Sequence, residues 1–160
     1  TTTKDLLYHV LSAQMNVMKT EGNFNSTTGA PLSLLAFETD ADFGIIEMGA
    51  NKPGEIEMIC NVVQPNMGLI TNISDAHLEH FCSKNEIAKT KSALFSCLPL
   101  NGTAFVNLDD PFISKMNVEC SRIEYSLSTT ADYQGMILKS RGLSGQCRGI
   151  DDLLIPQNDI

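Results

Sequence analysis

Residues 43–55 read Phe-Gly-Ile-Ile-Glu-Met-Gly-Ala-Asn-Lys-Pro-Gly-Glu, and this stretch decides the fold. Residues 43–46 form an apolar run that is too short for a helix and is bounded by Asp42 and Gly49, which predicts a buried strand. Glu47 then lies at the carboxyl end of that strand, where open parallel α/β sheets bind their ligands. A carboxylate at this place, just before a helix start, can hold a metal ion and a phosphate. The alternative is a strand-end glutamate that faces solvent.

Downstream, the sequence continues with a helix and a second strand. Pro53 and Glu55 open the helix, whose inward face holds Ile56, Ile59, Cys60 and Val63. Gln64-Pro65-Asn66 stops it, and residues 67–73 form another buried strand. A strand, a helix and a strand with short connections predict a right-handed parallel βαβ unit. The predicted fold class is therefore α/β, with a mostly parallel sheet flanked by helices.

Upstream, residues 3–15 predict a helix with one apolar face made of Leu6, Leu7, Val10, Leu11 and Met15. A short strand is expected at 16–19. Residues 22–29 form a polar loop, and Pro31 is expected at the first position of the next helix.

A capping box marks the start of a further helix, because Ser83 is followed by Glu86 three residues later. Lys91 falls in the middle of the apolar face of this helix, whereas Lys89 falls on the opposite, solvent side. A lysine on an apolar stripe is costly unless its amine reaches solvent, finds a partner or is chemically modified. Strands are expected next at 103–108, 123–127 and 133–139, and from Ser140 onward the pattern fades.

Length and composition indicate one ordinary domain, since the chain has 160 residues and is 42% hydrophobic. A net charge of −8 argues against nucleic acid or an anionic membrane as the main partner. The five widely spaced cysteines lack a C-x-x-C pair, which favours a reducing cytoplasm over a disulfide or zinc framework. No signal peptide and no membrane-spanning apolar run is evident in the sequence.

Chemistry-bearing residues follow two successive predicted strands and the helix after them. Glu47 and His77 lie one βαβ unit apart, so their strands are expected to be neighbours at one sheet edge. A carboxylate and an imidazole suit a divalent cation, whereas Lys91 must lose its positive charge to join them. A tighter alternative is a zinc site made of Asp75, His77, Glu79 and His80, although no strong zinc motif is matched.

The chain begins with Thr1-Thr2-Thr3-Lys4 and leads directly into a helix. In a P-loop, such a segment comes directly after the glycines and the lysine, and its threonine hydroxyl binds magnesium. The glycines and that lysine are not in the chain, and a threonine-rich helix cap is the alternative.

Taken together, these segments resemble the central, ATP-binding domain of the Mur ligases. The matching pieces, in order, are Thr1–Asp5, Gly22–Asn25 with Gly29 and Pro31, Glu47–Asn51 with Pro53–Ile56, Leu69–Ile73, Ala76–Glu79, Ala88–Lys91 with Leu94 and Phe95, and Asn107–Asp110. The resemblance implies ATP-dependent amide formation through an acyl phosphate, in the cytoplasm, with ATP and Mg2+ as cofactors. It is strongest to the branch that joins D-alanyl-D-alanine to UDP-N-acetylmuramoyl-tripeptide in peptidoglycan synthesis.

The resemblance also implies roles for individual residues. Thr1 and Thr2 contact the nucleotide, and Thr1 and Glu47 hold one magnesium ion. His77 helps to hold a second ion, supported by Lys91 as a carbamylated, anionic lysine. The implied substrate contacts are Asn23, Asn25 and, in addition, Asn72.

Several features depart from the family pattern. The first strand and the P-loop are missing, so residues 1–139 read as a partial central domain, and residues 140–160 form a tail unlike the family. The family's N- and C-terminal domains are also missing, which implies that the chain alone is inactive or nearly so. Three alternatives stay open: a sister Mur ligase, a ligase like folylpolyglutamate synthase, and a non-catalytic domain that binds a nucleotide sugar or a protein.

Overall fold

A computed structural model describes residues 1–74 and 81–135. In chain order the elements are α1 (Thr2–Leu11), β1 (Val17–Lys19), α2 (Gly29–Leu35), β2 (Phe43–Ile45), α3 (Glu55–Val63), β3 (Met67–Leu69), α4 (Lys84–Ser96), β4 (Thr103–Asn107), the 3-10 helix η1 (Ile113–Lys115), β5 (Ser121–Ser126) and β6 (Tyr133–Gln134). The chain is therefore a mixed α/β protein, as its sequence predicts. None of the helices in the described ranges is long and apolar enough to cross a membrane.

The strands form two parallel sheets. β1 pairs with β2, with Val17 opposite Phe43, and the larger sheet has the order β3-β4-β5-β6. The expectation that the strands before Glu47 and before His77 are neighbours is wrong for the described residues, because β2 and β3 belong to different sheets. Residues 43–73 therefore do form a strand, a helix and a strand, but these two strands do not pair.

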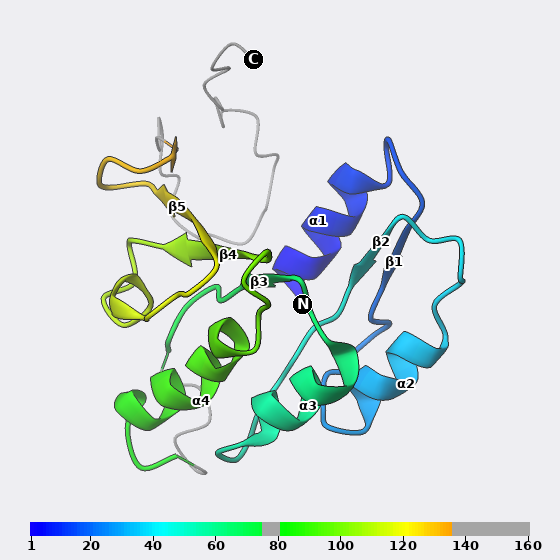
Figure 1. The fold of residues 1–160 in the computed structure, drawn as a ribbon, viewed down its shortest axis with the longest axis horizontal. Coiled ribbons are helices and arrows are strands. Elements are labelled where there is room, and N and C mark those ends of the chain that lie inside the picture. Colours follow the sequence, from blue (N-terminus) through cyan, green and yellow to red (C-terminus); the bar gives the residue numbers. More distant parts are fainter. Residues whose placement is uncertain (75–80, 136–160) are drawn as a thin grey trace, which may run out of the picture.

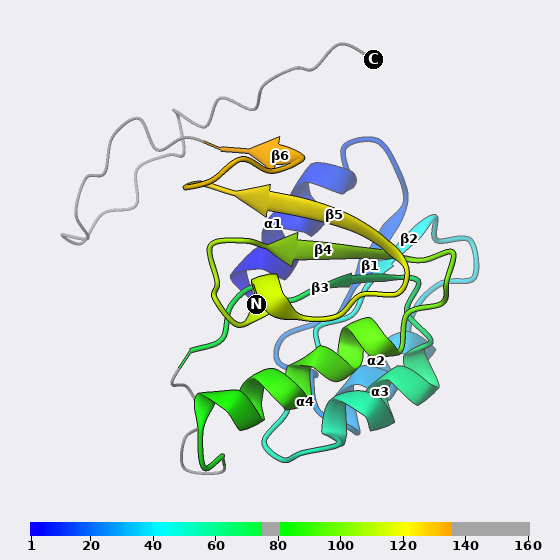
Figure 2. The ribbon, with the colours of Figure 1, turned by 60° about the vertical axis from the view of Figure 1, so that its left-hand side comes forward.

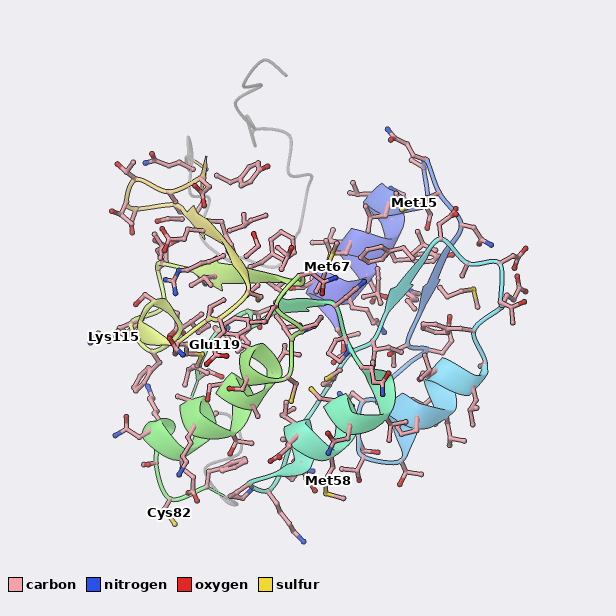
Figure 3. The ribbon with its side chains drawn as sticks, viewed as in Figure 1. Met15, Met58, Met67, Cys82, Lys115 and Glu119 are labelled. Atoms are coloured by element: carbon pink, nitrogen blue, oxygen red, sulfur yellow. The ribbon has the colours of Figure 1, made fainter. Side chains whose placement is uncertain are left out.

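The helices pack in two layers around the sheets (Figure 1). α2, α3 and α4 lie side by side in a row, and α1 lies on the other side of the molecule (Figure 2). The main core lies between α4 and the larger sheet, where Phe95, Ala104 and Val106 are buried. Side chains on the outer side of the helix row are exposed, as Met58 of α3 shows (Figure 3).

Helix α1 differs from its predicted form. It ends at Leu11 rather than near Met15, and Leu6, Leu7 and Val10 of the expected packing face are exposed. Lys4 is the buried residue of the helix. The physical reason is that α1 packs against β1 through the turn that holds Lys4, and no described element covers the leucine face.

Helices α3 and α4 keep the predicted boundaries, whereas α2 begins at Gly29, two residues before the predicted first position, Pro31. Ser83 caps α4 by accepting a hydrogen bond from the Glu86 amide, while the Glu86 carboxylate accepts one from the Cys82 amide. Gln64 ends α3 in the left-handed conformation. On α4, Lys89 is exposed and Lys91 is partly buried, as expected from the helical spacing. The strand predicted at 67–73 ends at Leu69. Of the strand predicted at 133–139, residues 133–135 are described, and β6 covers Tyr133–Gln134.

Candidate functional site

The candidate site lies where β1, β2 and the start of α1 converge. β1 and β2 run parallel, so both carboxyl ends meet at one edge, and the Thr20 amide continues the ladder to the Ile45 carbonyl at 2.8 Å. Glu47 lies two residues after Ile45, the last residue of β2, and its amide donates to Oγ1 of the fully buried Thr20 at 2.9 Å. The backbone at Glu47 is thus fixed to the end of the neighbouring strand.

The two carboxylate oxygens of Glu47 have different surroundings. Oε1 accepts hydrogen bonds from the Thr1 hydroxyl at 3.1 Å, the Thr1 amino group at 3.2 Å and the Asn25 side-chain amide at 3.2 Å. Oε2 is buried, and no hydrogen-bond donor within the described ranges satisfies it. The glutamate side chain is 19% exposed, which excludes the alternative of a strand-end residue that simply faces solvent.

The electrostatic balance at Glu47 favours the carboxylate. Burial by itself would raise its pKa, but hydrogen bonds from Asn25 and from the Thr1 amino and hydroxyl groups outweigh burial and lower the pKa below its ordinary value. Glu47 is therefore an anion at neutral pH and can act as a ligand or as an ion-pair partner.

Asn25 reaches Glu47 because the loop after β1 is tied to the segment after β2. The Asn25 carbonyl accepts from the Gly49 amide at 2.7 Å. A Cβ atom at position 49 would lie only 3.1 Å from Cγ of Asn25, so a glycine permits this close approach. Asn23 and Thr2 are exposed beside these residues.

Lys4 is the residue of this site that sequence reasoning missed. It is 5% exposed, and its ammonium donates to the carbonyls of Thr20 at 2.7 Å and Gly22 at 3.2 Å. The same nitrogen lies 3.8 Å from Oε2 of Glu47. Its place in the first helical turn, where a cation is unfavourable, gives no sequence signal of burial.

Lys91 forms a separate part of the candidate site. Its amine donates to the Asn72 carbonyl at 3.1 Å. Burial lowers the pKa of Lys91, and the nearby charge of Asp110 opposes this effect. Of the three alternatives for a lysine on an apolar face, the structure thus shows a partner, a backbone carbonyl. The Asn72 side chain itself is exposed.

His77 lies outside the described residues, as do Asp75, Glu79 and His80. The convergence of Glu47, His77 and Lys91 and the alternative zinc site therefore stay predictions. Among residues 1–74 and 81–135, no cluster of three or more His, Cys, Asp and Glu side chains could hold a metal ion.

The residues around Glu47 nevertheless fit a magnesium ion. Thr1 and Glu47 contribute a hydroxyl and a carboxylate, and Mg2+ prefers such oxygen ligands. Mg2+ keeps several waters and often binds only one or two protein groups together with phosphates. A carboxylate and a hydroxyl are therefore sufficient for such a site.

The comparisons with known proteins agree on one family. Residues 1–151 match the family model described as the Mur ligase middle domain. The UDP-N-acetylmuramoyl-tripeptide–D-alanyl-D-alanine ligase of Bacillus subtilis is 34% identical over 134 residues, which cover 84% of this chain and 29% of that protein. The chain thus spans less than a third of the length of this relative.

Solved structures agree with the sequence comparison. MurF from Acinetobacter baumannii superimposes with a TM-score of 0.78 at 30% identity, over 84% of this chain and 30% of the other. The MurF ligase from Thermotoga maritima, solved in complex with ADP, gives a TM-score of 0.77 at 30% identity, over 85% of this chain and 32% of the other.

Proposed function

The chain belongs to the Mur ligase family, as its middle domain, and from this we propose that it is the central part of an ATP- and Mg2+-dependent ligase of peptidoglycan precursors. The proposed reaction joins D-alanyl-D-alanine to UDP-N-acetylmuramoyl-tripeptide. The observation that carries the proposal is the contact of the Thr1 hydroxyl with Glu47 Oε1 at 3.1 Å. It brings together a helix start and a strand end that are 46 residues apart in sequence.

Thr1 and Glu47 are the residues that would hold the magnesium ion. The Thr1 hydroxyl stands at the N-terminus of α1, where the positive end of the helix dipole favours phosphate. The Glu47 carboxylate supplies the negative charge, and the Asn25 side chain donates a hydrogen bond to its Oε1. When bound, magnesium neutralises charge on the transferring phosphoryl group.

In this proposal the loop after β1 contacts the acceptor substrate. Asn25 is anchored to Glu47 and Gly49, so the exposed Asn23 beside it is held at the same sheet edge. Asn23 and Asn25 would contact the nucleotide-sugar peptide, with Asn72 as an additional contact. Thr2 would lie against the nucleotide.

Lys91 would act as a carbamate together with His77. Only a neutral amine attacks carbon dioxide, forming a C–N bond and releasing one proton. Burial lowers the pKa of Lys91 and so increases the neutral fraction. The Asn72 carbonyl at 3.1 Å holds the amine at the end of the segment that follows β3.

The same proposal includes a strand and a phosphate-binding loop that precede Thr1 in the protein. β2 and β3 are both edge strands, and each has one edge that no strand of the described residues pairs with. Leu6, Leu7 and Val10 of α1 are exposed, and so is Met67 at the start of β3 (Figure 3). An additional strand between β2 and β3 would pair both edges and cover apolar surface.

The coding sequence upstream of Thr1 gives a direct test. The proposal expects codons for Gly-Lys immediately before Thr1, preceded by further glycine codons. An unrelated upstream sequence would favour a non-catalytic domain that binds a nucleotide sugar or a protein.

Activity is tested with the complete open reading frame that contains this chain. With ATP, Mg2+, UDP-N-acetylmuramoyl-tripeptide and D-alanyl-D-alanine, phosphate release should depend on all four components. Glu47→Gln should lower the rate at least about 100-fold, as expected when a transition-state charge contact is lost. Glu57→Gln is the matched control, because Glu57 is exposed on α3. Equal rates for the two variants would refute the role of Glu47.

Lys91→Ala tests the carbamate separately. The variant should lose most of its activity, and a small added carboxylate should restore part of it by filling the gap. Full activity without any supplement would refute the carbamate.

A further inference from the structure

Lys4 combines two unfavourable features that its surroundings must offset. Its side chain is 5% exposed, and burying an ammonium is costly unless it is paired and hydrogen-bonded. It also lies in the first turn of α1, where the helix dipole opposes a cation. Only specific partners explain a lysine at such a position.

The partners of Lys4 come from three different segments. Two donors are taken by carbonyls just past the end of β1, those of Thr20 at 2.7 Å and Gly22 at 3.2 Å. The nitrogen also lies 3.8 Å from Asp5 of its own helix and 3.8 Å from Oε2 of Glu47. Lys4 thus connects α1, the loop after β1 and the end of β2.

The contact with Glu47 is selective for one oxygen. Oε1 accepts hydrogen bonds from Thr1 and Asn25. Oε2 is buried and has no hydrogen-bond donor among the described residues, and the positive charge of Lys4 nearby offsets its negative charge. Thr20 strengthens the link, because its carbonyl accepts from Lys4 and its hydroxyl accepts from the Glu47 amide. Lys4 therefore acts on both the side chain and the backbone of Glu47.

We propose that Lys4 is a positioning residue for Glu47: its buried ammonium fixes the Thr20–Gly22 segment and the Oε2 side of the carboxylate, so that Oε1 is presented beside Thr1 and Asn25. The proposal rests on the proposed function, since that function makes Glu47 a magnesium ligand. Lys4 itself touches neither the substrate nor the metal.

Two readouts on the complete protein that contains this chain test the proposal. Lys4→Met should speed hydrogen exchange of the Glu47 amide by at least about tenfold, because a hydrogen bond to a charged group is lost, while the Val106 amide in β4 keeps its rate. The same variant should weaken Mn2+ binding, measured by electron paramagnetic resonance, about 10- to 100-fold, as outer-shell changes at metal sites do.

Lys19→Met is the matched control, because Lys19 also pairs with Asp5 but its ammonium lies over the ring of Tyr8 rather than beside Glu47. It should leave Glu47 exchange and Mn2+ affinity within about twofold of the wild type, as expected for a surface ion pair. If Lys4→Met does not fold, Lys4→Gln is used in its place, since an amide keeps a donor for a carbonyl without the charge. A general acceleration of exchange that includes Val106 would show a merely structural role and overturn the proposal.

The sign of the Mn2+ effect separates positioning from simple repulsion. Removing a cation near a carboxylate should tighten Mn2+ binding if repulsion dominates, so tighter or unchanged binding in Lys4→Met would overturn the proposal. The proposed function fails in a different way, namely if the wild type binds no Mn2+ or if Glu47→Gln binds it equally well. In that case the exchange of the Glu47 amide alone decides whether Lys4 positions Glu47.

Discussion

Replacing Asp110 by asparagine tests how the end of β4 is tied to the segment after β3. Asp110 is 8% exposed. Its Oδ2 accepts from the Ile73 amide at 2.7 Å, and its Oδ1 accepts from the amides of Phe112 at 2.9 Å and Ile113 at 3.1 Å. A carboxylate can accept on both sides, whereas an asparagine can accept on only one.

The expected loss of stability in Asp110→Asn follows from this geometry. In the better orientation, the new asparagine side chain would keep the two bonds on one side and turn its NH2 group toward the buried Ile73 amide. One backbone donor and one side-chain donor then lack acceptors, at about 1–3 kcal/mol for each buried group, so the expected loss is about 3 kcal/mol. At a urea slope of about 2 kcal/mol per M, the unfolding midpoint should fall by about 1.5 M.

The neighbouring carboxylate provides the control. Asp109 also accepts several hydrogen bonds, from Ser126, Leu127 and Ser128, but it is exposed. Solvent can replace those bonds, so Asp109→Asn should cost less than about 1 kcal/mol. Urea unfolding followed by circular dichroism measures both variants. Equal costs, or a cost below about 1 kcal/mol for Asp110→Asn, would refute the reasoning.

Three further predictions concern pH, packing and helix capping. Hydrogen bonds from Ser128, Leu127 and Ser126 lower the pKa of Asp109 to about 2 from an ordinary value of 3.8. Because the folded pKa lies below the unfolded one, the stability from Asp109 is present above about pH 4 and lost as the pH falls toward about 2. Urea unfolding at several pH values should therefore show the difference between wild type and Asp109→Asn shrinking over that range, and a constant difference would contradict it. Gly49→Ala should cost about 1 kcal/mol by crowding, since its Cβ meets the Asn25 side chain at 3.1 Å; an unchanged melting temperature would argue against that contact. Ser83→Ala should cost about 1 kcal/mol by removing the cap of α4, whereas Ser92→Ala in the middle of the same helix should stay within about 0.5 kcal/mol.

The sequence predicted local structure well where local rules decide it. The Ser83 capping box, the end of α3 at Gln64 and the exposure of Lys89 follow from residue spacing and turn chemistry, and the structure confirms them. Glu47 was found because a carboxylate directly follows a short apolar run. The parallel pairing of the strands follows from the alternation of strands and helices.

The failures arise where partners distant in sequence decide the structure. The spacing of Leu6, Leu7 and Val10 predicts a packing face, but no described element covers that face. Lys4 is buried because carbonyls 16 and 18 residues away accept its hydrogen bonds, and no local pattern reveals them. The expected pairing of β2 with β3 fails for the same reason, since the pairing of strands depends on which other strands are present.

The central claim is that Glu47 and Thr1 form a divalent-cation site at the shared end of β1 and β2. Mn2+ titration of the 15N-labelled chain tests it most directly, because a bound paramagnetic ion broadens only nearby amide signals. The signals of Thr2, Asn25 and Met48 should broaden first, and Glu47→Gln should abolish this effect. Broadening centred elsewhere, or broadening at these residues that persists in Glu47→Gln, would contradict the claim.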